Sequence, residues 1–134
     1  ETPRTRVSVL TPYIDAVHND NVAQLQAAGV DVVTSMNLGF SVDAMTSAAS
    51  RDYITECADA LLGDGGHTDV VFIGCSAFRA MAPGYITELE RHLSDRTQRS
   101  VAVVTSMQAF FWHMLRSAGI DDRIDDYGVL FRTH

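Results

Sequence analysis

Residues 69–74 read DVVFIG, four apolar residues held between an aspartate and a glycine. A strand that is apolar on both faces is typical of the centre of a parallel sheet, because helices cover it from both sides. Three more β-branched runs predict strands at residues 6–11 (RVSVLT), 30–34 (VDVVT) and 100–105 (SVAVVT). The residue that follows the central strand is Cys75, so this stretch predicts both the fold and the place of a thiol.

Helical periodicity fills the intervals between the strands. Apolar residues at helical spacing predict helices over residues 14–28, 51–62, 83–93 and 109–118, with Gly29, Gly63 and Gly119 as natural stops. Pro83 is expected at the first position of the third helix, where proline is favoured. Residues 36–49 have no clear period and predict a long loop, and residues 65–68 predict a turn.

Strict alternation of strands and helices predicts a single α/β domain over residues 1–134 with a doubly wound, four-stranded parallel sheet. The usual strand order for such a unit is 2-1-3-4. This order places the ends of the first and third strands side by side at a topological switch point, where such folds bind ligands. Tyr13 and Cys75 should therefore face each other.

Composition and charge narrow the class of protein. The 134 residues are 46% hydrophobic and 20% charged, as in a folded domain. The net charge of −7 argues against a nucleic-acid partner, because binding to phosphates needs clustered Lys and Arg. No stretch approaches the ~20 apolar residues of a membrane span, so no membrane partner is expected. Two cysteines without metal-type spacing predict a reducing, cytoplasmic location and no bound metal.

No cofactor is expected either. The sequence has no glycine fingerprint between a strand and a helix, no phosphate-binding loop of the Walker type and no nucleophile elbow around a serine. Small and polar residues gather instead where the predicted strands end. We expect one substrate site to be lined by Thr11, Pro12, Tyr13, Cys75, Ser76, Ala77, Thr105 and Ser106.

Each candidate has a functional and a structural interpretation. A thiol held by N–H groups is a competent general acid or base near neutral pH, which is the role predicted for Cys75. Its alternative is that of a small buried hydrophobe, the interpretation that we favour for Cys57 in mid-helix. Tyr13 could bind a carboxylate or an enolate, or simply begin a helix. Ser106 could stabilise an oxyanion, although capping the last helix is the more common role.

Five stretches together resemble one known family. They are LTPYIDAVHNDNV (10–22), LGFSVDAM (38–45), VVFIGCSAFRAM (70–81), VAVVTSMQAFFWHMLRSAGI (101–120) and YGVLF (127–131). In this order they resemble the second half of the maleate cis–trans isomerases and arylmalonate decarboxylases, within the aspartate/glutamate racemase superfamily. The third and fourth stretches are the most specific, and the five span nearly the whole chain.

The resemblance implies a two-half racemase-like enzyme that works without a cofactor next to a substrate carboxylate. Cys75 matches the family's second-half cysteine, which moves a proton, and Tyr13 matches its cleft tyrosine. Isomerases of the family commonly read Cys-Thr-Asn where this chain has Cys75, Ser76 and Ala77, and they commonly have an asparagine where this chain has Met107. Two side-chain amides that would bind a dicarboxylate are therefore absent here. The resemblance thus implies an isomerase or decarboxylase acting on a small dicarboxylic acid.

Two alternatives stay open at the level of sequence. One is an amino-acid or hydantoin racemase of the same superfamily, in which two thiols would exchange protons with one carbon. The other is a half-domain without catalytic activity that serves as a binding or interaction module. Either way, we expect the chain to need a partner, which would be a missing N-terminal half or a second copy. Alone, it should expose apolar surface.

Overall fold

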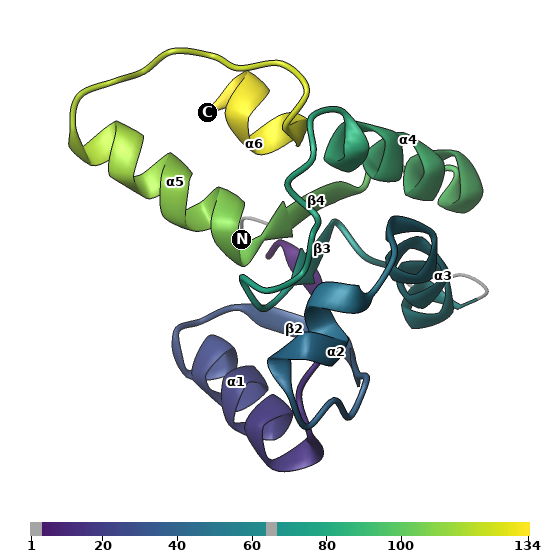
Figure 1. The fold of residues 1–134 in the computed structure, drawn as a ribbon. Helices are drawn as coiled ribbons and strands as arrows, with labels where there is room; N and C mark the ends of the chain where they lie inside the picture. Colours follow the sequence, from purple (N-terminus) through teal and green to yellow (C-terminus); the bar gives the residue numbers. More distant parts are fainter. Residues whose placement is uncertain (1–3, 64–66) are drawn as a thin grey trace.

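In a computed structural model that describes residues 4–63 and 67–134, strands and helices alternate along the chain (Figure 1). The elements are β1 (Arg6–Thr11), α1 (Asp15–Ala27), β2 (Asp31–Asn37), α2 (Asp43–Ala48), α3 (Arg51–Leu62), β3 (Val70–Ile73), α4 (Tyr85–Thr97), β4 (Ala102–Thr105), α5 (Ser106–Ser117) and α6 (Gly128–Thr133). Within the described ranges, no helix is long and apolar enough to cross a membrane.

The strands form one parallel sheet in the order β2-β1-β3-β4, which confirms the predicted α/β fold and strand order. Leu10 of β1 is paired with Met36 of β2 on one side and with Ile73 of β3 on the other. The N–H of Gly74 extends this pairing by donating to the Leu10 carbonyl at 2.8 Å. The carboxyl ends of β1 and β3 therefore lie next to each other, as a switch point requires.

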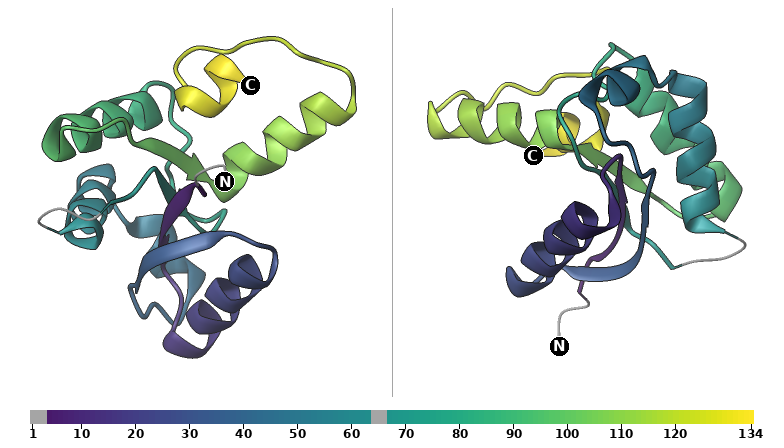
Figure 2. Two further views of the ribbon diagram at one scale, coloured as in Figure 1. Left: turned by 180° about the vertical axis from the view of Figure 1, so that it is seen from behind. Right: turned by 60° about the horizontal axis from the view of Figure 1, so that its bottom comes forward.

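Helices cover the sheet from both sides. Helices α3 and α4 lie over one side, which we call the closed face, and α1 and α5 lie over the other, which we call the open face (Figures 1 and 2). Helix α6 lies beside β4 and contacts both α4 and α5. Each segment between a strand and the next helix leaves the sheet at its carboxyl edge, so the loops with chemical groups gather there.

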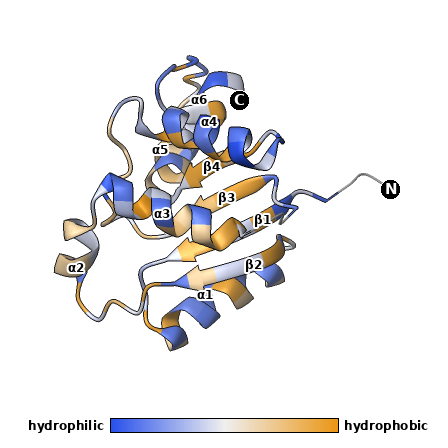
Figure 3. Ribbon diagram, turned by 90° about the vertical axis from the view of Figure 1, so that its right-hand side faces the viewer, coloured by the Kyte–Doolittle hydropathy of each residue, from blue (hydrophilic) through white to orange (hydrophobic). Residues whose placement is uncertain are grey.

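The hydrophobic core lies on the closed face, between the sheet and helices α3 and α4. Leu10, Val71, Ile73 and Val103 belong to it and are fully buried. Figure 3 shows the strongly hydrophobic colour of β3 and β4 in the sheet. Ile54 of α3 and similar residues of α4 pack against them. Because apolar burial is the main driving force of folding, this layer anchors the domain.

The open face is less completely covered. Val9 is buried, but its neighbours in register, Phe72 and Val104, are only half-buried. Helix α5 leaves Phe110 58% exposed and Met114 49% exposed. Helix α1 has almost no apolar stripe and leaves Val17 exposed. This face presents the apolar surface that was expected of a half-length unit.

Several element boundaries differ from the prediction. The predicted loop over residues 36–49 contains the end of β2 and the short helix α2. Helix α4 begins at Tyr85 rather than at Pro83, because the intervening Gly84 has a φ of 84° and donates its N–H to the Asp126 carbonyl at 2.8 Å. A helix does not continue through a left-handed residue, so Pro83 lies outside it. Gly65 and Gly66 of the predicted turn lie outside the described residues.

Candidate active site

Cys75 lies immediately beyond the carboxyl end of β3 and is half-buried against the rim of the core. Its φ of 113° falls in a region that residues with a Cβ rarely adopt. Such a conformation persists only where surrounding contacts impose it, and it is most common at functional sites. The chain thus turns sharply at the thiol instead of continuing as a strand.

Gly74 allows this turn to lie close to the neighbouring strand. A Cβ at this position would lie 3.3 Å from Phe72 Cε1 and 3.3 Å from Thr11 Cγ2. Both distances are shorter than a comfortable carbon–carbon contact, so a larger residue would push β1 and β3 apart. The glycine therefore keeps Cys75 next to the segment that follows β1.

Two hydrogen bonds hold Cys75 in its unusual conformation. Its backbone N–H donates to Ser106 Oγ at 3.0 Å, and the N–H of Ala77 points at the Cys75 Sγ at 3.4 Å. Ser106 belongs to the first turn of α5, and this helix follows directly after β4, the strand adjacent to β3. The turn after β3 is therefore held both by the start of α5 and by its own backbone.

Tyr13 lies across the switch point from Cys75. The pKa of its hydroxyl is raised to about 12, first by desolvation and then by the neighbouring Cys75 thiol and the negative charge of Asp43. Tyr13 is therefore a neutral phenol throughout the physiological pH range and remains able to donate a hydrogen bond. The arrangement places a permanent donor next to a sulfur that can change its protonation state.

The segment after β2 packs against the segment after β1 and fixes the place of Tyr13. The N–H of Phe40 donates to the Pro12 carbonyl at 2.7 Å, and the N–H of Gly39 donates to the Tyr13 carbonyl at 3.1 Å. The Asn37 side chain donates to the same Tyr13 carbonyl at 2.9 Å. Four residues in succession, from Asn37 to Phe40, thus hold the tyrosine loop.

A cavity of about 220 Å³ opens beside Tyr13. Phe40, Val42 and Asp43 line it together with Ile14 of the α1 entry. Val42 is 55% exposed, so the wall of this cavity is apolar and open to solvent. The segment that was predicted as a long loop therefore borders the site, although Phe40, Val42 and Asp43 were not among the predicted site residues.

Several predicted site residues have side chains that are already engaged. Thr11 is 1% exposed, and its hydroxyl is hydrogen-bonded to His18 Nδ1 at 2.8 Å. Pro12 is fully buried. Ser76 is exposed, and Ala77 contributes its backbone N–H. Thr11 and Pro12 thus pack beneath the site and do not offer their side chains to a substrate.

The N-cap of α5, the last of the helices predicted from sequence, is Thr105 and not Ser106, which corrects the prediction. The Thr105 hydroxyl accepts from the N–H of Gln108 at 3.1 Å, and the Gln108 Oε1 accepts from the N–H of Thr105 at 2.7 Å. This reciprocal pair is a capping box. The spacing Thr-x-x-Gln in the sequence was the signal for it. Thr105 is therefore engaged in the cap, whereas Ser106 is free to bind the backbone of Cys75.

His18 was not among the predicted site residues. It is 4% exposed, and its Nε2 lies 3.0 Å from Ser35 Oγ while its Nδ1 contacts Thr11. Burial lowers the pKa of its imidazole. A neutral His18 therefore connects the ends of β1 and β2 directly behind the tyrosine loop.

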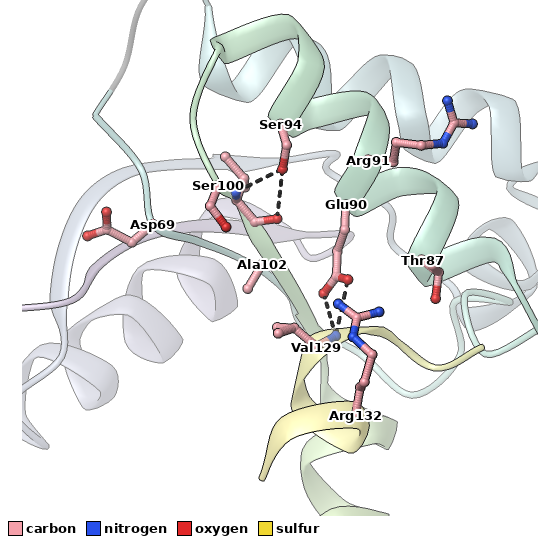
Figure 4. Close-up of a pocket in the computed structure, with 10 residues that line it drawn as sticks. Asp69, Thr87, Glu90, Arg91, Ser94, Ser100, Ala102, Val129 and Arg132 are labelled. Atoms are coloured by element: carbon pink, nitrogen blue, oxygen red, sulfur yellow. Dashed lines mark hydrogen bonds between the residues drawn. The ribbon is translucent and has the colours of Figure 1, made fainter. Parts of the chain in front are cut away.

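The remaining candidates lie away from this site. Cys57 is 7% exposed on the core side of α3, and burial raises the pKa of its thiol. A cavity of about 380 Å³ is lined by Glu90, Arg91 and Arg132 but opens at the amino ends of β3 and β4, the opposite edge of the sheet (Figure 4). Among the described residues, no group of three or more acidic, histidine or cysteine side chains could hold a metal ion.

Comparisons with known proteins agree with the family resemblance of the sequence. The family model for arylmalonate decarboxylase matches residues 1–131. No curated protein sequence matches the chain. Crystal structures of arylmalonate decarboxylase have the same fold: a liganded double mutant superposes with a TM-score of 0.82 at 23% identity, over 98% of this chain and 53% of that one.

Two maleate isomerases also share the fold. The enzyme from Pseudomonas putida has a TM-score of 0.81 at 21% identity, over 96% of this chain and 48% of that one. A mutant of the Nocardia farcinica maleate cis–trans isomerase with a covalently bound succinylcysteine intermediate has a TM-score of 0.81 at 19% identity, over 97% and 49%. The chain thus spans about half the length of these solved relatives. On the strength of the family match over nearly its whole length, the chain belongs to the arylmalonate decarboxylase family.

Proposed function

We propose that this chain is one half of a cysteine-dependent enzyme that works without a cofactor next to a carboxylate of a small dicarboxylic acid. The observation that carries the proposal is the place of Cys75, which follows β3 in an unusual backbone conformation next to the segment after β1 that carries Tyr13. Cys75 would be the proton donor and acceptor, and Tyr13 a hydrogen-bond donor to a substrate carboxylate or enolate.

Decarboxylation is the reaction that we favour. The bond between the α-carbon and one carboxylate breaks, CO₂ leaves, and the electron pair stays behind as an enediolate. Tyr13 donates a hydrogen bond to an enediolate oxygen. Cys75 then transfers its S–H proton to the carbon, and solvent reprotonates the thiolate. Positioned proton transfer contributes ~10²–10⁴ to a rate, so oriented hydrogen-bond donors must provide the rest.

The surroundings of the thiol support a substrate with an apolar substituent. Ser76 and Ala77 have no side-chain amide, so this segment is less polar than the Cys-Thr-Asn segment of the isomerases. The exposed apolar residues Val42 and Met45 lie in the segment that borders the cavity beside Tyr13. An arylmalonate carries an aromatic group beside its two carboxylates, whereas maleate has two carboxylates and no apolar substituent.

A second α/β half would complete the pocket. The solved relatives are about twice as long as the part that matches this chain, and the described site is an open wall rather than an enclosed cleft. Further donors for the departing and remaining carboxylates would have to come from that half or from a second copy of the chain. A closed pocket would also exclude water and strengthen these hydrogen bonds.

The test uses the complete gene product with phenylmalonate and maleate as substrates. The unmodified protein should release CO₂ from phenylmalonate, and the variant Cys75→Ala should lose at least ~10³-fold in kcat/KM while its circular dichroism spectrum stays unchanged. The variant Cys57→Ala is the matched control and should retain its activity. Near-normal turnover in Cys75→Ala would rule the mechanism out.

The same assay separates the alternative reactions. Fumarate formed from maleate without CO₂ release would identify an isomerase. With an amino acid or a hydantoin as substrate, loss of optical activity together with exchange of the α-proton for deuterium from the solvent would identify a racemase. Absence of all three activities, together with stable binding of a protein partner, would favour a module without catalytic activity.

A further inference from the structure

Gln108 is the most completely buried large polar side chain near the site, with 0% exposure. Both ends of its amide are used. Oε1 accepts from the N–H of Thr105 at 2.7 Å, and Nε2 donates to the Tyr127 carbonyl at 2.6 Å. One side chain thus joins the beginning of α5 to the segment that leads into α6.

Hydrogen bonds and close packing fix the position of that C-terminal segment. The Val129 N–H donates to both carboxylate oxygens of Glu90, at 3.0 and 3.1 Å, as the dashed lines in Figure 4 show. Gly128 has a φ of +81°, and a Cβ there would lie 2.7 Å from Ile86 Cγ2 and 3.3 Å from Gln108 Nε2. The tight packing around Gly128 therefore places the Tyr127 carbonyl where Gln108 can reach it.

At its other end, Gln108 connects to the thiol in two steps. Its capping box with Thr105 sets the direction in which the chain enters α5. The next residue, Ser106, accepts the N–H of Cys75 at 3.0 Å. The φ of 113° at Cys75 needs such a contact to persist, because the conformation is unfavourable for a residue with a Cβ.

We propose that Gln108 is a positioning residue for Cys75, which it holds through Thr105 and Ser106 while anchored on the C-terminal segment. This inference rests on the proposed role of Cys75 and extends it to a residue that does not touch the thiol. Without the Gln108 amide, the cap loosens, Ser106 shifts, and the backbone of Cys75 relaxes from its strained conformation. The sulfur then loses its alignment with Tyr13 and with the N–H of Ala77.

The experiment compares thiol reactivity in variants of the chain, with Cys57 as the internal reference. Gln108→Met keeps the length of the side chain but removes both amide groups. The contacts from Gln108 through Thr105 and Ser106 to Cys75 are called the relay below. Thr105→Val breaks the relay one step closer to the thiol, and Thr105→Ser retains the cap hydroxyl. Ser94→Ala removes the hydroxyl that accepts the Val101 N–H at 2.9 Å, next to the amino end of β4 and away from the capping box, so it is the matched control. Mass spectrometry follows the alkylation of Cys75 and Cys57 by iodoacetamide across a range of pH, and NMR records the backbone amide of Cys75.

We expect Gln108→Met and Thr105→Val to slow the alkylation of Cys75 relative to Cys57 by about fivefold or more, the effect of one lost hydrogen bond. Both should also shift the amide resonance of Cys75. Thr105→Ser should restore the rate, and Ser94→Ala should leave the ratio within about twofold of its original value. If Gln108→Met does not fold, the two Thr105 variants decide the question.

Each outcome separates the inference from the proposed function. If Cys75 in the unmodified chain reacts no faster than Cys57, the proposed function fails, and the amide resonance of Cys75 still tests the relay. If Cys75 is reactive but neither its rate nor its resonance changes in Gln108→Met or Thr105→Val, the inference is overturned. An equal change in Ser94→Ala would also overturn it, because general loosening of the contacts of β4 would then explain the effect.

Discussion

The two faces of the sheet differ in how completely they are built. On the closed face, Ile54 and Ile86 are 0% exposed and pack on central strand residues that are themselves buried. On the open face, Phe72 is half-buried and Phe110 is 58% exposed. The closed face therefore holds the fold together, whereas the open face has apolar surface to offer a partner. The candidate site lies at the carboxyl edge where both faces meet.

The comparison is tested most strongly by a matched pair of truncations. Ile54→Ala on the closed face should lower the free energy of unfolding by about 2–5 kcal/mol, since it leaves a cavity in the core. Ile14 is 46% exposed at the entry to α1, so Ile14→Ala should cost less than about 1 kcal/mol. Urea denaturation of both variants at one pH measures the difference. Equal losses would mean that the two faces contribute alike.

The two cysteines sharpen the same contrast, because one belongs to each environment. Burial raises the pKa of Cys57, which keeps it as a thiol, and its side chain is inaccessible. Cys75 is half-buried at the edge, with an N–H directed at its sulfur. Iodoacetamide at pH 7.5 should modify Cys75 at least about tenfold faster than Cys57. Peptide mapping by mass spectrometry gives both rates, and comparable rates would contradict the distinction.

His18 makes the region behind the site sensitive to acid. Burial lowers its pKa, so between that lowered value and the ordinary 6.5 the unfolded chain binds a proton that the folded chain does not. The stability that neutral His18 contributes is complete above pH 6.5 and is lost as the pH falls toward the lowered pKa.

The loss should amount to about 1.4 kcal/mol for each unit by which the pKa is lowered. His18→Gln can keep both hydrogen bonds without titrating, so its free energy of unfolding should vary less with pH in this window. Denaturation curves for both proteins between pH 7.5 and 5 measure the effect. Parallel pH profiles would show that His18 is not the group responsible.

The smallest effect on stability is expected on α5. Phe110→Ser should change the free energy of unfolding by no more than about 0.5 kcal/mol, because the ring is already in solvent. The same variant should weaken self-association of the isolated chain, since Phe110, Phe111 and Met114 form the exposed apolar part of this helix. Sedimentation velocity over a range of concentrations measures this. A parent chain that stays monomeric at high concentration would contradict the expectation.

Much of the fold could be predicted because its signals are local. The β-branched run at residues 6–11 became β1 with the same bounds, and Gly63 ended α3 where it was expected to. The predictions failed where a distant contact decided the boundary. Helix α4 begins late because Gly84 is bonded to Asp126, a residue far along the chain.

The candidate site was predictable in outline but not in detail. The residue types at the strand ends indicated Cys75 and Tyr13, and the strand order placed them opposite each other. The sequence did not reveal that Thr11 would bind His18, because residues seven positions apart on a strand and a helix meet only after folding. The capping box of Thr105 was encoded locally by the Thr-x-x-Gln spacing, but the prediction assigned the cap to Ser106 instead.

The sequence alone thus determined the alternation of strands and helices, the strand order and the thiol at the end of β3, since these follow from periodicity and from the rules of parallel sheets. Only the tertiary structure decided the backbone conformation of Cys75. That conformation depends on the hydroxyl of Ser106, 31 residues away, and on the amide of Gln108 that joins α5 to Tyr127. Such contacts form between segments that the sequence separates and the sheet brings together, so no local pattern encodes them.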